Sequence, residues 1–221
     1  MPRVVKVWDL PVRLFHWLLV VLIVVSFTTG KLGGNWLAWH FRSGYCILAL
    51  VLFRIVWGVT GSQTARFSDF IRGPKGVFTY ARSLFGGASM FHAGHNPMGG
   101  LMIVLMLALL LVQATTGLFV DDDAGTRAPL ADKASDAIVS LFTTIHRINI
   151  NVILVCVALH VCAALFYLLV RKDNLIVPMI TGRKAIPDNH PAPALSGVLP
   201  ALVIVALTGA FVAWLVLVYS R

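Results

Sequence analysis

The chain has 221 residues, of which 58% are hydrophobic and 12% are charged. Soluble domains are roughly half apolar and a quarter charged, so this chain lacks the charge that a water-facing surface needs. Its 18 Lys and Arg residues exceed 9 acidic residues, all of them Asp, and give a formal charge of +9. In a membrane protein an excess of basic residues indicates the orientation of the spans and is weak evidence for nucleic-acid binding. The composition therefore excludes a soluble domain and predicts an integral membrane protein with no nucleic-acid partner.

Five apolar runs are long enough to cross a hydrocarbon core, which takes about 20 helical residues. They cover about residues 12–30, 37–61, 98–120, 143–170 and 196–219. The first run lacks a small-residue cleavage site, so we predict a retained helix and not a signal peptide. The last run follows the Pro-rich stretch PDNHPAPALSG. We expect an all-α membrane protein, with a four-helix transmembrane bundle in residues 1–184 and a linker with a fifth transmembrane helix in residues 185–221.

Basic residues that stay in the cytoplasm predict the orientation of the spans. Eleven of them gather in three segments that the spans place on one side: Arg3, Lys6, Arg13, Arg66, Arg72, Lys75, Arg82, Arg171, Lys172, Arg183 and Lys184. The loop 121–142 instead carries Asp121, Asp122, Asp123, Asp132 and Asp136 against Arg127 and Lys133. We therefore predict a cytoplasmic N-terminus, an acidic external loop and an external C-terminus.

Four histidines lie in or beside the apolar spans, where an ionisable ring is costly and suggests function. They are His16, His40, His146 and His160. His160 follows His146 by fourteen residues. In a helix this separation is about 40° short of four full turns and about 21 Å along the axis, so the two histidines share one face at two depths. The alternating direction of the spans pairs His40 with His146 at the outer level and His16 with His160 at the inner level.

Two facing imidazoles at each of two levels suit the axial positions of two b-type haems. Gly44 follows His40 by one helical turn and leaves room beside it for a flat macrocycle. Arginines near these positions could contact the anionic haem propionates. They are Arg13, Arg42, Arg54 and Arg147. Positive-inside topology explains Arg13 equally well, and Gly44 could mark only a close helix crossing.

Other polar residues have simpler explanations. His92 and His95 lie in a Gly-rich stretch and His190 lies in the linker, so we predict loop residues there, with a metal or quinone role as the alternative for the first two. Gln113, Thr115 and Thr116 could line a quinone site, but hydrogen bonding between helices is the favoured interpretation. The three cysteines form no zinc or covalent haem motif.

Several strings resemble the bacterial cytochrome b561 and nickel-iron hydrogenase b-type cytochrome family. They are WDLPVRLFHW, WHFRSGY, FRIVWGVTGSQTARFSDF and NLIVPMITGRK, together with the histidine pair of the fourth span. The similarity covers about residues 7–184. It implies a four-helix bundle whose haem ligands come from the first, second and, twice, the fourth helix, positions that match His16, His40, His146 and His160. The fifth helix departs from the family pattern and could serve an oligomer or a partner.

The resemblance also implies electron transfer in the bacterial inner membrane, between quinone and a periplasmic hydrogenase, other dehydrogenase or c-type cytochrome. The acidic loop could steer a basic partner. A first alternative is a quinone reductase that oxidises superoxide or another small molecule. A more distant alternative is a histidine-based metal-ion transporter, although the apolar spans contain no Asp or Glu.

Overall fold

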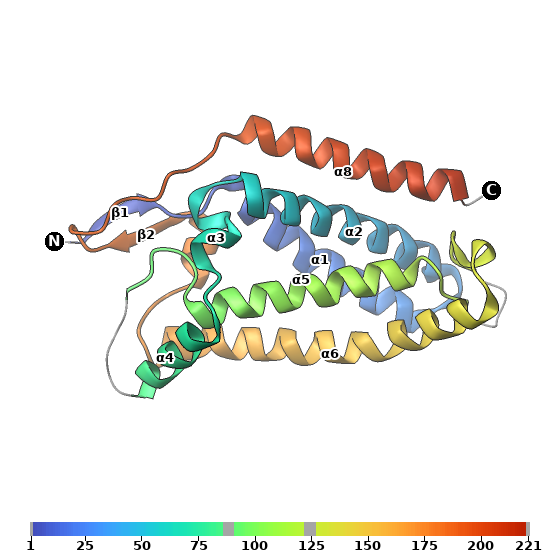
Figure 1. The fold of residues 1–221 in the computed structure, drawn as a ribbon, viewed down its shortest axis with the longest axis horizontal. Coiled ribbons are helices and arrows are strands. Elements are labelled where there is room, and N and C mark those ends of the chain that lie inside the picture. Colours follow the sequence, from blue (N-terminus) through green and yellow to red (C-terminus); the bar gives the residue numbers. More distant parts are fainter. Residues whose placement is uncertain (1, 86–90, 122–126, 220–221) are drawn as a thin grey trace. The chain divides into compact units, whose positions relative to one another are not determined.

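The computed structural model describes residues 2–85, 91–121 and 127–219. It is predominantly helical, as predicted, and the described residues also form one two-stranded ladder (Figure 1). The elements in chain order are β1 (Arg3–Lys6), α1 (Leu10–Leu32), η1 (Gly34–Trp36), α2 (Leu37–Thr60), η2 (Gln63–Ala65), α3 (Phe67–Phe70), α4 (Pro74–Phe85), α5 (Pro97–Gly117), η3 (Ala131–Lys133), α6 (Asp136–Leu169), α7 (Ile176–Thr181), β2 (Arg183–Ile186) and α8 (Val198–Tyr219).

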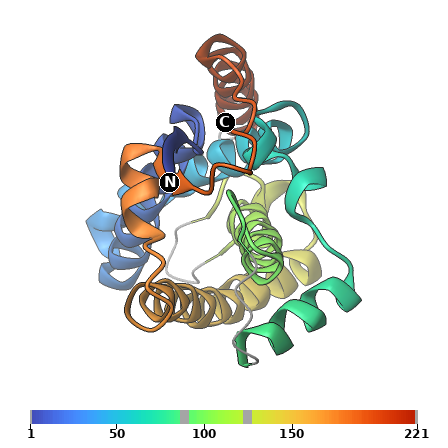
Figure 2. The same cartoon turned by 90° about the vertical axis from the view of Figure 1, so that its left-hand side faces the viewer.

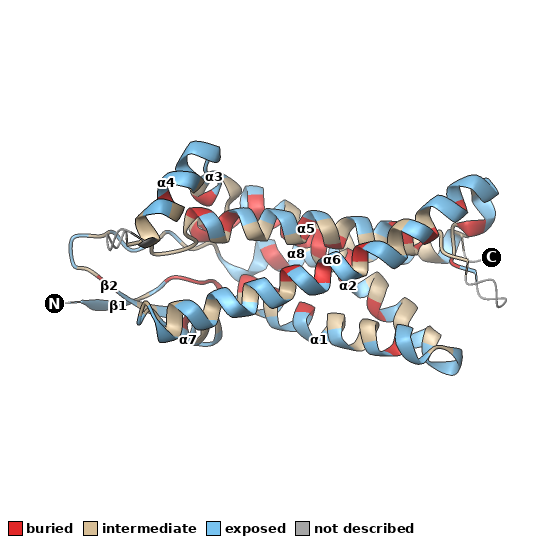
Figure 3. Cartoon of the chain, turned by 90° about the horizontal axis from the view of Figure 1, so that it is seen from below, coloured by how far each residue is buried: buried red, intermediate tan, exposed pale blue. Residues whose placement is uncertain are grey.

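Among the described residues, five helices are long and apolar enough to cross a membrane: α1, α2, α5, α6 and α8. They match the five predicted spans closely. The clearest difference is in α6, which begins at Asp136 and not near Thr143. Exposed and half-buried positions follow α1 and α6 along much of their length (Figure 3), and the exposed side chains are largely apolar. Apolar exposure on this scale fits a lipid environment.

The chain forms two compact units. Unit 1 comprises Met1–Phe15, Arg54–Leu105 and Ala158–Leu202, and unit 2 comprises His16–Phe53, Met106–Val157 and Val203–Arg221. Each of the five long helices contributes one stretch to each unit.

In unit 1, the two chain segments farthest apart in sequence pair as an antiparallel ladder. Strand β1 runs against β2, from Arg3 opposite Ile186 to Lys6 opposite Arg183. The ladder continues into a turn in which Gly182 closes α7 at φ +80° and its carbonyl accepts the Val7 N–H at 2.8 Å. Only glycine adopts this left-handed conformation without strain. Figure 2 looks onto these short elements, with α7 in orange and α4 in green.

The start of α1 is fixed by a buried N-cap in unit 1. An Asp9 carboxylate oxygen accepts the Val12 N–H at 2.7 Å, and its other oxygen accepts the Trp57 indole N–H at 3.0 Å. Asp9 is only 5% exposed, and Trp57 is fully buried. An acidic cap satisfies an otherwise unpaired N–H of the first helical turn. This explains why the string WDLPVR opens the first span.

The Pro-rich linker is held against unit 1 and is not a free tether. Gln63 donates its backbone N–H to the Ala194 carbonyl at 2.9 Å and accepts the Ala194 N–H on its side chain at 3.0 Å. Ser196 donates its N–H to the Ser62 hydroxyl at 2.8 Å. The linker and the turn after α2 therefore form one hydrogen-bonded structure.

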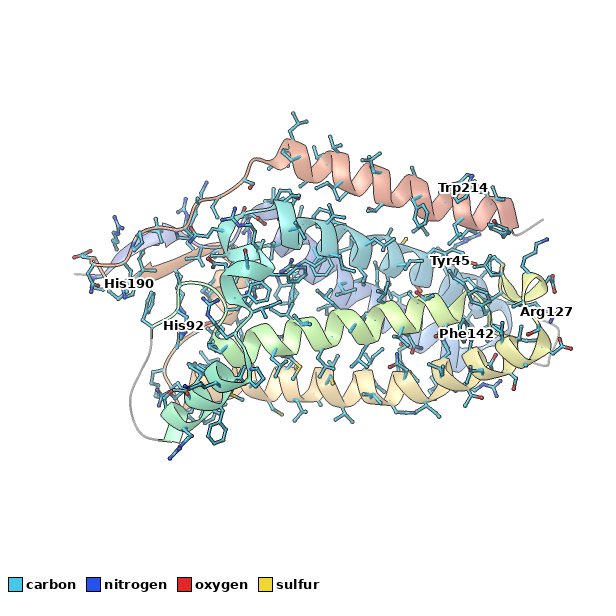
Figure 4. The ribbon with its side chains drawn as sticks, viewed as in Figure 1. Tyr45, His92, Arg127, Phe142, His190 and Trp214 are labelled. Atoms are coloured by element: carbon cyan, nitrogen blue, oxygen red, sulfur yellow. The ribbon has the colours of Figure 1, made fainter. Side chains whose placement is uncertain are left out.

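In unit 2, α8 packs through Val212 against Leu48 of α2 and Leu118, just beyond α5. Trp214, on the same helix, is exposed (Figure 4). The fifth helix is therefore packed in part against α2 and the turn after α5. The predicted boundary at residue 184 stays a prediction.

Candidate functional site

Unit 2 contains a cavity of about 500 Å³ lined by residues of α1, α2, α5 and α6 and of the turn after α5. Its walls are mostly apolar, and the imidazoles of His40 and His146 both reach it. Its lining comprises Ile23, Ser26, Phe27, Gly30, Lys31, Leu37, His40, Phe41, Gly44, Tyr45, Ile47, Leu110, Gln113, Ala114, Gly117, Leu118, Val120, His146, Arg147, Ile150 and Ile153. An apolar cavity with a few convergent polar groups is typical of a cofactor site.

His40, near the start of α2, is oriented by α1. Its Nδ1 lies 2.8 Å from the Ser26 carbonyl oxygen and 3.3 Å from the Ser26 hydroxyl. Because a carbonyl can only accept, Nδ1 carries the proton in this contact. In neutral imidazole the other nitrogen, Nε2, then keeps its lone pair for a metal.

His146, in α6, is oriented in the same way by α5. Its Nδ1 donates to the Gln113 carbonyl at 2.9 Å and lies 3.5 Å from the Thr116 hydroxyl. The Gln113 side chain in turn donates to the His146 carbonyl at 3.1 Å. Both histidines therefore have Nδ1 fixed by a neighbouring helix, which leaves the Nε2 lone pair of each available to a metal ion.

The distance between the two rings fits one metal ion between them. The His40 and His146 centroids are 6.1 Å apart, with the ring planes at 86°. Metal–imidazole bonds of about 2 Å on opposite sides of one ion place the centroids roughly 6 Å apart. The predicted outer pair is thus brought together, in a cavity wide enough for more than an ion. Within the described residues no group of three or more His, Cys, Asp or Glu could hold a metal ion.

Three glycines shape this cavity. A Cβ at Gly30 would lie 2.7 Å from the His40 Nδ1, and one at Gly117 would lie 2.9 Å from the His146 Cε1. A Cβ at Gly44 would meet no atom within 4 Å. The first two glycines therefore give the rings room to lie against the neighbouring helix. Gly44 leaves open space at the cavity wall, as a flat cofactor would require.

The four candidate arginines lie in different surroundings. Arg147 lines the cavity and is exposed, whereas Arg42 lies over the Trp39 ring at 5.4 Å and does not line it. In unit 1, Arg54 is 2% exposed and lies 5.4 Å from the Phe67 ring. Arg13 donates to the Ile180 carbonyl and is half-buried. Of the four, Arg147 is the one beside the His40–His146 pair.

The inner histidines fall in separate units. His16 belongs to unit 2, where its ring lies edge-on to Trp17 at 4.9 Å, and His160 belongs to unit 1. Both are half-buried. Their pairing stays a prediction from sequence.

Comparison with known proteins identifies the family. The sequence profile of prokaryotic cytochrome b561 matches residues 7–182. The chain belongs to this family. It is therefore an all-α integral membrane protein and a b-type cytochrome of electron transfer, with haem b as its cofactor. This confirms the family that the sequence motifs had indicated.

Curated relatives of this cytochrome carry a hydrogenase-related name. This chain is 25% identical over 220 residues to a "Probable Ni/Fe-hydrogenase B-type cytochrome subunit" of Azotobacter vinelandii, and the match covers 85% of this chain and 91% of the relative. A protein of the same name from Rhizobium leguminosarum bv. viciae is 25% identical over 217 residues, covering 84% of this chain and 91% of the relative. No solved structure matches this chain significantly.

The acidic loop of the cytochrome is partly neutralised by its own arginine. Arg127, in the loop before α6 (Figure 4), forms ion pairs with Asp121 at 2.9 Å and with Asp132 at 2.5 Å. Asp122 and Asp123, also predicted to steer a partner, lie outside the described residues. Two of the described carboxylates of this loop therefore form ion pairs within the chain.

The loop histidines of the cytochrome line a second cavity, of about 300 Å³, in unit 1. His95 lies against both Trp8 and Phe70, with ring centroids 4.5 and 4.8 Å away. His92 packs edge-on against Tyr80, and His190 packs against Phe91 (Figure 4). Aromatic packing accounts for these rings, and His190 is a half-buried residue of the linker.

Sequence reasoning missed most of the residues that orient His40 and His146. Gln113 was expected to form hydrogen bonds between helices, and it does, but Ser26, Gly30, Gly117 and Asn149 were not singled out. The two glycines gave a usable signal, since small residues in membrane helices mark close contacts. The carbonyls of Ser26 and Gln113 gave none, because every residue has one.

Proposed function

We propose that this cytochrome carries two b haems and passes electrons across the bacterial inner membrane between the quinone pool and a periplasmic redox protein. The observation that carries this proposal is the His40–His146 pair. Two imidazoles 6.1 Å apart in an apolar cavity, each with Nδ1 bound to a carbonyl, are prepared for bis-histidine ligation of one haem iron.

The residues around this pair have separable roles. His40 and His146 would ligate the iron through Nε2, and the Ser26 and Gln113 carbonyls hold the two rings in orientation. Gly44 leaves space for the macrocycle, and Arg147 at the cavity edge would pair with a propionate. Haem b held there would supply one-electron chemistry at its iron, within a potential range set by the axial ligands and burial.

The second haem is proposed from sequence and from one buried charge. His16 and His160 are its expected ligands, by helix spacing and by resemblance to the family. Arg54 supports an anionic group nearby, because its guanidinium is buried in an apolar helix and, within the described residues, its Nη1 has no hydrogen-bond partner. The Asp9 carboxylate interacts with this charge, but the Nη1 N–H groups still lack an acceptor among the described residues, which is costly in a buried position, and a haem propionate would satisfy them. Arg13 and Arg42 stay candidates for further propionate contacts.

Topology and partners complete the proposal. The distribution of Lys and Arg supports a cytoplasmic N-terminus and a periplasmic C-terminus. The name of the curated relatives supports a hydrogenase as the periplasmic partner. Another dehydrogenase or a c-type cytochrome would meet the same chemical requirement, and a second copy of the chain could pack on α8.

A haem count tests the ligand assignment. The purified protein should show the low-spin b-type spectrum and about two haems per chain by pyridine haemochrome, and His146→Ala should lose the haem of the His40–His146 cavity while keeping the other. His160→Ala should lose the complementary one, distinguishable by its midpoint potential. Arg171→Ala, outside the spans, is the control for the handling of variants. Full haem content in His146→Ala would exclude that ligand assignment.

A further inference from the structure

A buried amide pair connects α5 to α6 beside the His146 ring. Asn149 lies three residues after His146 and is 7% exposed. Its side-chain NH₂ donates to the Leu109 carbonyl and to the Gln113 side-chain oxygen, both at 2.9 Å. These contacts lie within unit 2 and join two helices at the level of the predicted ligand.

Gln113 contacts His146 at two points. Its backbone carbonyl accepts the ring Nδ1–H at 2.9 Å, and its side-chain NH₂ donates to the His146 carbonyl at 3.1 Å. The oxygen of that same side chain is the one that Asn149 holds. The network therefore runs from Asn149 through Gln113 to the imidazole, and moving Asn149 would release the side chain that fixes the α5–α6 spacing.

Two buried hydroxyls of unit 2 bond mainly within their own helices. Ser43 donates to carbonyls of α2, at Trp39 and His40, and Thr116 donates to Val112 and Gln113 of α5, with its oxygen also 3.5 Å from the His146 Nδ1. Bonds within one helix satisfy a hydroxyl without positioning a neighbour. Asn149, by contrast, donates from α6 to two acceptors on α5. A buried amide is costly unless paired, so these contacts are strong constraints on the interhelical geometry.

We propose that Asn149 is a positioning residue which, through Gln113, sets the reduction potential of the haem iron ligated by His146. The proposal rests on the haem assignment above. A hydrogen bond from Nδ1–H to a carbonyl makes an imidazole a stronger donor to its metal and favours the more oxidised ion. Weakening that bond makes the ligand a poorer donor, so the ferrous state gains and the midpoint potential rises.

The test compares two asparagines on α6 of the full-length cytochrome. Asn149→Leu should change the ferric-to-ferrous equilibrium of the His146 haem by about tenfold, a positive shift of about 59 mV for a one-electron couple. It should also alter the low-spin ferric EPR signal of that haem, because the imidazole plane turns. Asn151→Leu is the matched control, since Asn151 is exposed and donates only to Arg147 of its own helix. It should leave both readouts unchanged.

A double variant tests the route through Gln113. Gln113→Leu should raise the same potential, and Asn149→Leu with Gln113→Leu should raise it no further than the larger single shift, because both remove one pathway. If Asn149→Leu does not retain haem, Asn149→Asp replaces it, since it keeps the shape and loses the NH₂ donor. Equal potentials in Asn149 and Asn151 variants, or additive shifts, would overturn the proposal.

The haem count separates this proposal from the proposed function. Before the potentials are compared, His146→Ala identifies which redox component belongs to the His40–His146 cavity. If His146→Ala retains full haem, the ligand assignment is wrong and the Asn149 proposal is wrong with it. If that haem is lost in His146→Ala but its potential is unmoved in Asn149→Leu, only the positioning role of Asn149 is wrong.

Discussion

The two units stabilise their polar groups in opposite ways. In unit 2, hydrogen bonds between helices gather at His40 and His146, where Nδ1 of each ring donates to a carbonyl of the adjacent helix. In unit 1, polar contacts join segments distant in the chain, such as Asp9 with Trp57 and Ser62 with Ser196. The first arrangement orients two imidazoles, and the second connects the ends of helices to the loops.

This difference predicts different consequences of mutation. A loss in unit 1 removes a connection between segments and should lower stability. A loss beside the histidines of unit 2 should leave the helices formed, because their backbone bonds are internal, and should change the site instead. The stability of the protein should therefore respond to mutations in unit 1, and its haem content should respond to mutations beside the histidines of unit 2.

The largest effect is expected at Asp9 in unit 1. Asp9→Ala removes the N-cap of α1 and the carboxylate that accepts the buried Trp57 indole N–H. We expect a loss of roughly 2–4 kcal/mol, from the cap and this buried hydrogen bond together. Detergent-solubilised protein would be followed by thermal or denaturant unfolding.

The control for Asp9 is another aspartate of the same unit. Asp173 pairs with Lys184 at 3.0 Å, and the Asp173 side chain is 43% exposed while that of Lys184 is 11% exposed. Because water reaches this carboxylate, we expect Asp173→Ala to cost about 1 kcal/mol, less than the loss at Asp9. Comparable losses in both variants would show that the buried cap has no special importance.

At Gly117 in unit 2 we expect a smaller effect on the free energy of unfolding and a direct effect on the site. In Gly117→Ala the new Cβ would lie 2.9 Å from the His146 Cε1, so the ring must leave the position that its Gln113 hydrogen bond defines. We expect haem affinity to fall roughly 10- to 100-fold while helix content is unchanged. Haem per chain, measured with circular dichroism on the same sample, checks both parts.

Two other glycines sharpen this result. Gly209→Ala on α8 places a Cβ with no atom within 4 Å, so it should keep wild-type haem content. Gly44→Ala also meets no atom of the chain within 4 Å, but it lines the cavity. If Gly44 leaves space for the cofactor, its variant should lose haem without losing stability. Wild-type haem in both Gly117→Ala and Gly44→Ala would contradict the assignment of this cavity.

The sequence predicted the long helices well because each apolar run exceeds what a soluble helix needs. It missed the start of α6, where Asp136 begins a turn that is helical but more polar than the rest. It also missed α3, α4 and α7, which are too short or too polar to show as spans. The pairing of β1 with β2 depends on contacts between opposite ends of the chain, which local patterns cannot indicate.

The candidate site, like the fold, was predicted only in part. Spacing and alternating direction were enough to bring His40 and His146 together, because helix geometry fixes depth and face. The hydrogen-bond acceptors of those rings are backbone atoms, and the glycines beside them matter only through the position of an absent Cβ. Arg42 looked equivalent to Arg147 because each lies within two residues of a histidine, yet of the two only Arg147 lines the cavity. Adjacent residues on a helix point in different directions, and depth alone does not reveal which one faces inward.

The smallest effect is expected at Tyr80, on α4 outside the spans, and it concerns the pH dependence of unit 1. Burial, with the hydrogen bond between the Tyr80 and Tyr167 hydroxyls at 2.7 Å, raises the pKa of Tyr80 above its ordinary value. The unfolded chain then ionises first, near pH 10, so the folded state holds more protons above that pH and its stability falls as pH rises. Tyr80→Phe removes this contribution. The melting temperature of the wild type should therefore decline more steeply than that of Tyr80→Phe between about pH 9 and pH 11, while parallel curves would show that the phenol is not shielded in the folded protein.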